Sequence, residues 1–394
     1  MTEENISVLK SPNIEKKEKV VTALGGDGIG PEVINATVGV LKAMKVPGLI
    51  IKEMPCGESA MEKYGTAFPD ETRNSVDNCD AVLFGAIHET ATQVLAYLRW
   101  GLGNYANIRP IKYFKGVYTN LKTECVENVN YAFVRENTEG MYASAGKEGK
   151  LRKLIKKGLI YKADIERWTR KAVYGLRIVS PKATDRIGEV ACQLCEKRKE
   201  EGVGKGLLEI VCKPNVLRAQ DGMFIERIKK IAKKKYPELK VETYIVDDFA
   251  ARLIRFPAEH DTIVIPNMMG DILSDEAAQI IGGLGLAGSG VYGSKTPYFE
   301  PTHGSAPDIT GMNIANPSAT IISACMMLDY LGYVNESKNL LKVLENTLAG
   351  ALEIDKNWKT LPADVVPPNY RKEKKYGSTT DVANKILEEY KKLG

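Results

Sequence analysis

The sequence has no apolar run approaching the roughly 20 residues that a membrane-spanning helix needs. Its first nineteen residues are polar and charged and contain no apolar core of a signal peptide, so we expect a cytoplasmic protein. The seven cysteines lack the spacing of a disulfide framework, which favours reduced thiols in a reducing compartment. Cys192 and Cys195 form a C-x-x-C motif inside a helical pattern, without a second pair. We interpret them as buried helix residues rather than as a zinc or redox site.

The charge lacks a strong excess of either sign, with a formal net charge of +5. Lysines cluster in residues 147–157 and 229–235, where apolar residues at helical spacing interrupt them. This pattern is typical of solvated helix faces. Nucleic-acid binding would need a larger basic excess with interleaved aromatics, so we do not expect it. A modest positive field would still help to attract a polyanionic substrate.

Neither an internal repeat nor a low-complexity linker is visible in the 394 residues, a length that allows two domains around a large core. Short apolar runs typical of strands alternate with helical patterns, which predicts an α/β fold with a largely parallel sheet. Ligand sites in such folds lie beyond the carboxyl ends of strands. The basic insert 147–171 is expected to form a protruding arm. The predicted strands include residues 20–24, 81–84, 131–134, 208–211 and 243–246.

The glycine-rich turn at residues 25–32 lacks the fingerprint of dinucleotide-binding Rossmann folds. Its spacing is G-x-G-x-G, whereas the fingerprint needs G-x-G-x-x-G running into a helix. Pro31 stands at the first position of the predicted helix that continues over residues 32–44, where proline is well tolerated. We therefore expect these glycines to allow a tight turn and a close backbone approach.

Two carboxylates stand four residues apart where a helix is expected to begin. Asp271 and Asp275 follow the apolar strand 261–266 and would lie on one face of the first helical turn. They could hold Mg²⁺ or Mn²⁺, which prefer oxygen ligands, or they could simply complement the helix dipole. Asp247 and Asp248 close another predicted strand and offer a further carboxylate for a metal.

Three arginines stand in segments where a ligand cleft is expected. Arg109 and Arg135 each end an apolar segment, and Arg99 precedes them in the chain. Because arginine binds carboxylates in a bidentate manner, the three together suit a substrate with at least two carboxylates. Tyr142 lies just beyond the third arginine. It is either a rim aromatic or a proton donor whose pKa nearby cations lower.

A lysine and an acid at other segment ends complete the candidate groups. Lys213 follows the strand 208–212, and burial or neighbouring cations there would favour the neutral amine, which can act as a base. The long turn at residues 300–309 contains His303 and Asp308. Asp308 could accept a hydrogen bond from the 2′-hydroxyl of an adenosine ribose, which would favour NAD over NADP.

Seven motifs in one order along the chain carry a resemblance to a known family. They cover residues 26–32, 105–110, 135–142, 213–215, 267–275, 282–286 and 303–316. With these motifs the sequence resembles the β-decarboxylating dehydrogenases, the family of isocitrate, 3-isopropylmalate and homoisocitrate dehydrogenases, from residue 20 to residue 387. The resemblance implies the two-domain, non-Rossmann α/β fold of isocitrate and isopropylmalate dehydrogenases, with a protruding arm. Residues 1–104 plus 282–394 would form the large cofactor-binding domain, and residues 105–281 would form the small domain.

The resemblance also implies an activity and the residues that perform it. The enzyme would oxidise and decarboxylate a 3-substituted malate, using NAD and Mg²⁺ or Mn²⁺. The substrate carboxylates would be bound by Arg99, Arg109 and Arg135. The catalytic residues would be Tyr142, Lys213 and Asp247, and the metal ligands would be Asp247, Asp271 and Asp275. The cofactor-binding residues would be Glu300, His303, Gly304, Asp308, Ile309 and Asn316. Lys213 and Asp247 would reach in from the partner subunit, so a homodimer, or a higher assembly built from it, would be the active unit.

Residues just before Arg99 in the sequence would contact the third substituent of the substrate and so determine which substrate binds. Isocitrate enzymes usually have Ser and Asn where this chain has Gln93 and Leu95. An apolar wall of Leu95, with Val216 from the other subunit, would leave a third carboxylate without a partner and slightly favours 3-isopropylmalate. Gln93 keeps isocitrate or homoisocitrate open as alternatives. NADP users of the family typically have a Lys-Tyr pair at the position of Asp308 and the following isoleucine, which supports NAD.

An alternative of another class is a catalytically silent regulatory subunit of such an enzyme. A silent subunit would be expected to have lost its proton-transfer or metal residues. Tyr142, Lys213, Asp271 and Asp275 are all present, so catalysis is the favoured interpretation.

Overall fold

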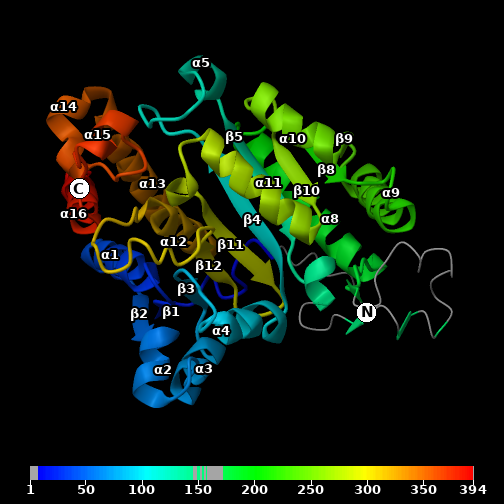
Figure 1. Ribbon diagram of the computed structural model, residues 1–394, viewed down its shortest axis with the longest axis horizontal. Helices are drawn as coiled ribbons and strands as arrows, with labels where there is room; N and C mark the ends of the chain where they lie inside the picture. The colour runs from blue at the N-terminus through cyan, green and yellow to red at the C-terminus, as the bar shows by residue number, and fades with distance from the viewer. Residues whose placement is uncertain (1–7, 145–148, 151–152, 155–156, 158–171, 394) are drawn as a thin grey trace.

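The computed structural model describes residues 8–144, 149–150, 153–154, 157 and 172–393. A ten-stranded mixed sheet runs through the molecule, and helices cover it on both faces (Figure 1). From one edge to the other, the strands follow the order β2 (Leu49–Met54), β1 (Lys19–Leu24), β3 (Ala81–Phe84), β12 (Tyr298–Pro301), β11 (Gly288–Gly293), β4 (Asn104–Lys112), β5 (Asn130–Glu136), β10 (Thr262–Ile265), β8 (Leu207–Cys212) and β9 (Lys240–Ile245).

The strand pairs toward both edges of this sheet are parallel, whereas the pairs β12–β11, β11–β4 and β4–β5 in its middle are antiparallel. The prediction of a largely parallel sheet is thus confirmed, with an antiparallel centre that the sequence pattern did not indicate. The predicted strands did not include β4, because its side chains Asn107 and Arg109 are polar although both are buried. Of the two, Arg109 lines the cavity described below and is not part of a hydrophobic core.

The strands of the two predicted domains form separate halves of the sheet. Strands β1–β3, β11 and β12 come from residues outside 104–281 and lie on one side, and β4, β5 and β8–β10 lie on the other. This is the two-domain, non-Rossmann α/β architecture that the resemblance implied. The precise boundaries next to residues 104 and 282 stay a prediction.

Helices pack tightly on the half of the sheet that contains the N-terminal strands. There, α12 lies directly against β11 and β12 and contacts α1 and α13 on its other sides. It is buried nearly all round, as expected for a helix between a sheet and further helices. The helices of this half are α1 (Gly30–Ala43), α2 (Glu58–Tyr64), α3 (Asp70–Asp77), α4 (Thr92–Ala96), α12 (Ser318–Tyr330), α13 (Val334–Ala349) and α16 (Thr379–Lys391). A π-helical turn, Tyr97–Gly101, follows α4 and contacts β4.

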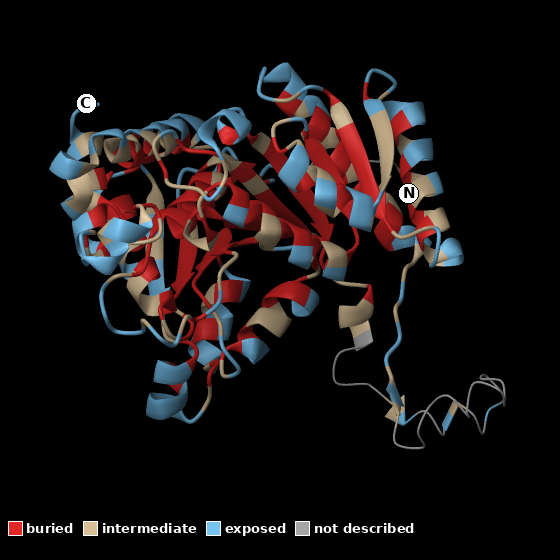
Figure 2. Cartoon of the chain, turned by 45° about the horizontal axis from the view of Figure 1, so that its top comes forward, coloured by how far each residue is buried: buried red, intermediate tan, exposed pale blue. Residues whose placement is uncertain are grey.

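The second half of the sheet carries the helices on which several candidate residues lie. Here α8 (Pro181–Glu200) packs on β4, β5, β8 and β10, and α9 (Arg218–Lys235) packs on α8. The helix α11 (Asn267–Ile280) packs on β4 and β5 and contacts α10 (Val246–Arg255). All four residues of β10 are buried, as expected for an inner strand with covered faces. Figure 2 shows the buried residues concentrated in the central strands, with exposed residues on the outer helices.

Short elements complete the fold. They are α5 (Thr123–Val126), η2 (Met141–Ser144), η3 (Leu284–Leu286), η4 (Gly350–Glu353), α14 (Ile354–Asn357), η5 (Trp358–Thr360) and α15 (Pro368–Lys372). A separate pair of strands, β6 (Gly149–Lys150) and β7 (Val173–Tyr174), is antiparallel. Most of the predicted arm, 147–171, lies outside the described residues. In the described part of the chain, no helix combines the length and the apolar character that crossing a membrane requires.

The glycine-rich turn has the conformation that its spacing predicted. Gly26 and Gly28 have φ angles of 80° and 57°, a region that favours glycine. A Cβ atom at Gly28 would lie 2.2 Å from the carbonyl oxygen of Ser305, so this turn closely approaches the loop after β12. Cys192 and Cys195 are buried within α8, which confirms their assignment as helix residues.

Two predictions about element ends are wrong by a few residues. Asp247 and Asp248 do not close a strand, since β9 ends at Ile245 and both acids lie in the first turn of α10. Asp271 and Asp275 lie in the second and third turns of α11 rather than in its first. The reason is that α11 begins at Asn267, directly after Pro266, which separates it from the end of β10 at Ile265.

Candidate active site

A cavity of about 270 Å³ lies where the two halves of the sheet meet. Residues of both halves line it, and they include all three predicted arginines. Its lining contains Ile87, Leu95, Arg99, Arg109, Arg135, Tyr142, Asp271, Glu300, His303 and Gly304. The structure therefore gathers most of the predicted substrate and cofactor residues around one space.

The three arginines reach this cavity from three different elements. Arg109 lies on β4 and Arg135 on the neighbouring strand β5, where Arg135 pairs with Asn107 in the register. Arg99 lies on the π-helical turn, a distortion that often marks functional sites. All three are buried, so their charges require partners either in the protein or in a ligand.

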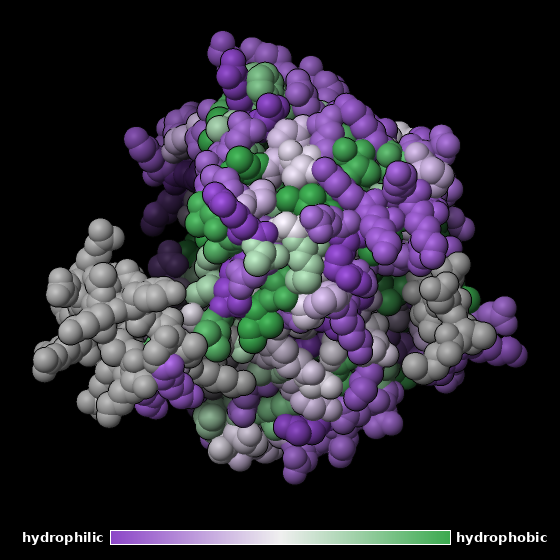
Figure 3. Space-filling model, turned by 90° about the vertical axis from the view of Figure 1, so that its right-hand side faces the viewer, coloured by the Kyte–Doolittle hydropathy of each residue, from purple (hydrophilic) through white to green (hydrophobic). Residues whose placement is uncertain are grey.

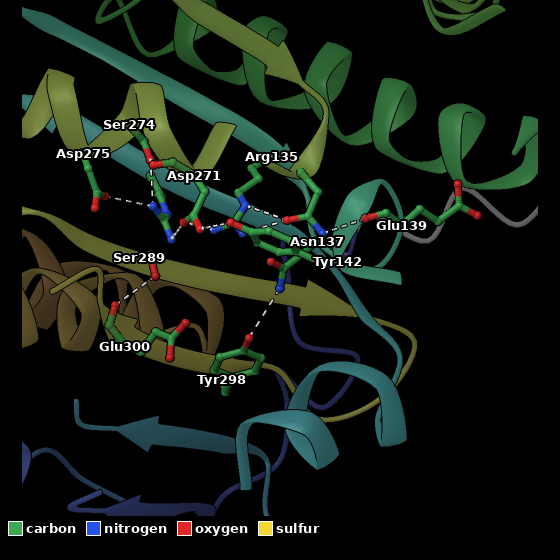
Figure 4. Close-up of polar contacts among 12 residues, drawn as sticks. Arg135, Asn137, Glu139, Tyr142, Asp271, Ser274, Asp275, Ser289, Tyr298 and Glu300 are labelled. Atoms are coloured by element: carbon green, nitrogen blue, oxygen red, sulfur yellow. Dashed lines mark hydrogen bonds and ion pairs between the residues drawn. The ribbon is translucent and has the colours of Figure 1, made fainter. Parts of the chain in front are cut away.

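Asp271 is the main internal partner of these cations (Figure 4). Its Oδ1 lies 2.5 Å from Nη1 of Arg135 and 3.2 Å from Nη2 of Arg109. Its Oδ2 accepts a hydrogen bond of 2.9 Å from the hydroxyl of Tyr142. One turn further along α11, Oδ1 of Asp275 lies 3.2 Å from Nη1 of Arg109. The carboxylates of Asp271 and Asp275 thus balance part of the positive charge of Arg109 on β4 and Arg135 on β5.

The surroundings of Asp271 and Asp275 shift the pKa values of the two carboxyl groups in opposite directions. Burial opposes ionisation of Asp271, but Arg135 and Arg109 outweigh it and lower the pKa of this carboxyl. Burial raises the pKa of Asp275, and the charge of Asp271 adds to this effect against the attraction of Arg109. Burial and the neighbouring Arg109 lower the pKa of Arg135 to about 9, which still leaves it charged at neutral pH.

Tyr142 differs from its prediction. We expected nearby cations to lower its pKa, but burial and the carboxylate of Asp271 raise the pKa of Tyr142, against Arg135 and Arg99. The prediction that the pKa of Tyr142 is lowered is therefore wrong. A hydroxyl that keeps its proton and points at the cavity can still donate that proton to a more basic atom.

Two polar residues of the site were missed by the sequence reasoning. Asn267 accepts hydrogen bonds from Nε and Nη2 of Arg135, at 3.1 and 2.7 Å. Ser274 accepts one of 2.7 Å from Nη1 of Arg109. Asn267, Asp271 and Ser274 recur at helical spacing, and that periodicity of polar residues on a helix packed against a sheet was the available signal.

The carboxylates on α11 fit a divalent cation only in part. Asp271 and Asp275 are oxygen donors one turn apart beside the cavity, which suits Mg²⁺ or Mn²⁺. Among the described residues, no group of three metal-ligating side chains lies together. Asp247, the third predicted ligand, lies on α10 and its side chain is 67% exposed. A single chain therefore supplies two of the three predicted ligands to one place.

Lys213 and Asp247 form an ion pair outside the cavity lining. Lys213 follows β8, but its side chain is 27% exposed, so it is less buried than expected. The charged group that it contacts is the carboxylate of Asp247 and not a cation. The ammonium of Lys213 lowers the pKa of Asp247. Val216 is exposed near Lys213, and Gln93 is exposed on α4, so neither belongs to the lining.

The predicted cofactor residues extend from the cavity along the loop after β12. Glu300 is buried at the cavity, and burial raises its pKa to about 7, although Arg99 opposes the shift. His303 follows, and burial lowers the pKa of its imidazole. Its Nε2 is buried without a hydrogen-bond partner among the described residues.

Farther along this loop, Asp308 is exposed and Ile309 is half-buried. Asn316 is buried and donates a hydrogen bond of 2.9 Å to Oδ1 of Asp364. An unpaired imidazole nitrogen, an exposed carboxylate and the close approach of Gly28 leave polar groups along this loop for a dinucleotide. These residues fit such a cofactor.

Comparisons with known proteins agree with this geometry. The family model for isocitrate/isopropylmalate dehydrogenase matches residues 20–384. A 3-isopropylmalate/3-methylmalate dehydrogenase of Methanocaldococcus jannaschii is 41% identical over 330 residues, which cover 84% of this chain and 91% of that protein. An isocitrate/homoisocitrate dehydrogenase of Thermus thermophilus is 39% identical over 334 residues, which cover 83% of this chain and 90% of the relative. The crystal structure of isocitrate dehydrogenase from Methylococcus capsulatus superposes with a TM-score of 0.77 at 30% identity, over 94% of this chain and 99% of that one.

Proposed function

Because the chain belongs to the isocitrate/isopropylmalate dehydrogenase family, we propose that it oxidises and decarboxylates a 3-substituted malate with NAD, and that 3-isopropylmalate is its preferred substrate. The observation that carries this proposal is the set of three buried arginines around a small cavity with an apolar wall. The arginines suit two carboxylates, and the wall suits an alkyl substituent.

Arg99, Arg109 and Arg135 bind the substrate in this proposal. Their burial excludes water and strengthens each charge-assisted hydrogen bond to a carboxylate. Arg109 and Arg135 are already held by Asp271, Ser274 and other acceptors on α11, so they meet the substrate in fixed orientations. Such preorganisation reduces the entropy cost of binding.

Two groups of the chain move protons in this proposal. Lys213, supplied by a second copy, takes the proton of the substrate hydroxyl as the neutral amine, after its ion pair with Asp247 has opened. After loss of CO₂, Tyr142 gives a proton to the carbon from which the carboxylate has left, since its hydroxyl lies on the cavity and keeps its proton. Asp271 accepts a hydrogen bond from Tyr142 and holds the hydroxyl in place until then.

Asp271 and Asp275, with Asp247 from a second copy, would hold Mg²⁺ or Mn²⁺. When bound, the cation would supply positive charge that stabilises negative charge on the reacting substrate, and NAD would supply the hydride acceptor. Without that cation, Arg109 and Arg135 compensate the acids on α11.

The position of Lys213 and Asp247 supports the proposal of a homodimer with shared sites. Both lie outside the cavity of their own chain. Large apolar side chains are exposed on the contacting helices α10 and α11, with Ile254 at 54% and Ile272 at 61%. Hydrophobic side chains also gather among hydrophilic ones on the side of the molecule toward α9 and β9 (Figure 3). We propose that a second copy covers α10 and α11 and that each copy supplies Lys213 and Asp247 to the other.

The apolar wall determines the substrate in this proposal. Leu95 and Ile87 line the cavity beside the arginines and are half-buried. We expect the highest kcat/KM for 3-isopropylmalate in a comparison with isocitrate, homoisocitrate, tartrate and malate. Leu95→Ala should lower kcat/KM for 3-isopropylmalate by roughly tenfold, because alkyl contacts are lost, and should change the value for isocitrate less. A higher kcat/KM of the wild type for a tricarboxylate would contradict the substrate assignment and favour isocitrate or homoisocitrate instead.

The cofactor preference is predicted to depend on the loop after β12. Asp308 would accept a hydrogen bond from the ribose 2′-hydroxyl of NAD and repel the 2′-phosphate of NADP. The double change Asp308→Lys with Ile309→Tyr should shift the ratio of kcat/KM for NADP and NAD by at least about tenfold toward NADP. Initial rates with each dinucleotide measure this shift. Asp70→Lys on α3 makes a similar charge change at an exposed site and is the control. An unchanged ratio would remove Asp308 as the ribose contact.

A further inference from the structure

A buried asparagine at the start of α11 lies behind Arg135 and outside the cavity lining. Asn267 is the first residue of this helix and is 1% exposed. A buried primary amide has two N–H donors and one oxygen acceptor, and these groups require partners. The partners of Asn267 fix the direction in which its amide faces. They also connect two groups that the proposed mechanism uses at different steps.

The amide oxygen of Asn267 accepts two hydrogen bonds from one guanidinium. Nε and Nη2 of Arg135 donate to it at 3.1 and 2.7 Å, and Nη1 of Arg135 contacts Asp271. Gly270 lies on the same face of α11, and a Cβ atom there would lie 2.9 Å from Cγ of Arg135. The stem of the arginine therefore passes directly over the helix. Three residues of one helix face thus hold this side chain in one orientation.

This arrangement leaves part of the guanidinium available to a ligand. A guanidinium has five N–H donors, and among the described residues Asn267 and Asp271 accept from three of those of Arg135. The remaining two, one on each terminal nitrogen, match the number that a bidentate carboxylate accepts. Because the asparagine is neutral, it orients the arginine without adding another negative charge beside the substrate carboxylates.

The amide nitrogen of Asn267 fixes the turn that carries Tyr142. Nδ2 donates a hydrogen bond of 2.9 Å to the carbonyl oxygen of Glu139. The next residue, Gly140, has a φ angle of 76°, and a Cβ atom there would lie 3.3 Å from Cβ of Asn267. Tyr142 follows two residues later, and its hydroxyl donates to Asp271 on the next turn of α11 (Figure 4). The segment with Tyr142 is thus attached to α11 at two points.

We propose that Asn267 is a positioning residue that couples two steps of the reaction: it orients Arg135 for a substrate carboxylate and holds the turn that places Tyr142. The inference rests on the proposed function, in which Arg135 binds the carboxylate and Tyr142 protonates the carbon that has lost CO₂. An aspartate at this position would face the carbonyl of Glu139 with an oxygen that cannot donate. The primary amide serves the guanidinium and the carbonyl at once.

The variant Asn267→Ala removes both sets of hydrogen bonds and tests this inference. We expect KM for the preferred 3-substituted malate to rise about tenfold, because Arg135 loses bonds that orient its charge. We expect kcat to fall about tenfold, because Tyr142 is held less precisely. KM for NAD should stay within about twofold. Ser337→Ala is the control, since it removes a buried hydrogen bond of 2.7 Å from α13 to the carbonyl oxygen of Cys325 in α12 and should change none of these constants.

Asn267→Ser is measured in parallel, because its hydroxyl keeps a polar group at the start of α11 and lowers the risk to folding. The serine oxygen is one bond short of the amide oxygen and nitrogen that it replaces. The same changes in KM and kcat are therefore expected.

Two double-mutant cycles separate positioning from a general structural effect. If Asn267 acts through Arg135, Asn267→Ala should add less than about twofold to the KM of Arg135→Lys. If it acts through the turn, it should lower the kcat of Tyr142→Phe by less than about twofold. Additive effects in either cycle, or wild-type constants for Asn267→Ala, would overturn the inference while the proposed function stands. If the wild type turned over no 3-substituted malate, the proposed function would fall and this role would fall with it.

Discussion

Lys213→Met should lower kcat by roughly 10²–10⁴-fold, the range for loss of a general base, and should leave the fold and NAD binding unchanged. Lys213 is partly exposed just after β8 and forms an ion pair with the exposed Asp247, so little packing is lost. Steady-state kinetics with the preferred substrate measure the loss. Lys240→Met, which breaks an exposed ion pair on the neighbouring strand β9, is the control. Wild-type turnover of Lys213→Met would remove Lys213 from the mechanism.

The same variant can show whether the active site is shared between two copies. A mixture of Lys213→Met and Arg135→Met homodimers, unfolded and refolded together, should regain activity although neither variant is active alone. Random pairing gives mixed dimers in which one site combines the intact Arg135 of one copy with the intact Lys213 of the other. About a quarter of wild-type activity is then expected. A refolded mixture no more active than its separate components would place Lys213 in the site of its own chain.

Arg135→Met should reduce kcat/KM by roughly 10³-fold, because it removes a buried, charge-assisted contact to a substrate carboxylate. Arg135 is the most buried of the three arginines and has the shortest contact to Asp271. Among the described residues, its loss also leaves Asp271 with Arg109 as its one remaining ion-pair partner, so we expect a lower melting temperature.

The variant Arg135→Lys separates the two effects of this substitution. It keeps the charge beside Asp271 but cannot form the bidentate arrangement with Asn267 or with a carboxylate. Stability should largely return, while KM should stay high. Arg227→Met on the outer surface of α9, where Arg227 pairs with Asp185, should change neither quantity. A normal KM in both Arg135 variants would contradict the assignment of Arg135 to substrate binding.

The sequence was sufficient to predict the family, the α/β architecture and the convergence of the three arginines, because each of these follows from a strand, a helix or a motif read locally. Their distances to Asp271 could not be predicted, since they depend on the register of β4 with β5 and on the start of α11 at Asn267. Sequence reasoning also missed the strand β4, which carries Arg109 into the site among other buried polar residues.

Tyr142 was identified correctly as a neighbour of Arg135, but the direction of its pKa shift depends on Asp271, which only the fold brings beside it.

The most direct test of the central claim is the simultaneous measurement of NADH and CO₂ released by the wild-type protein from 3-isopropylmalate, with NAD and Mg²⁺ or Mn²⁺. Oxidative decarboxylation predicts that NADH and CO₂ appear in equal amounts and that both depend on the divalent cation. NADH without CO₂, or no reduction of NAD with any 3-substituted malate, would contradict the account.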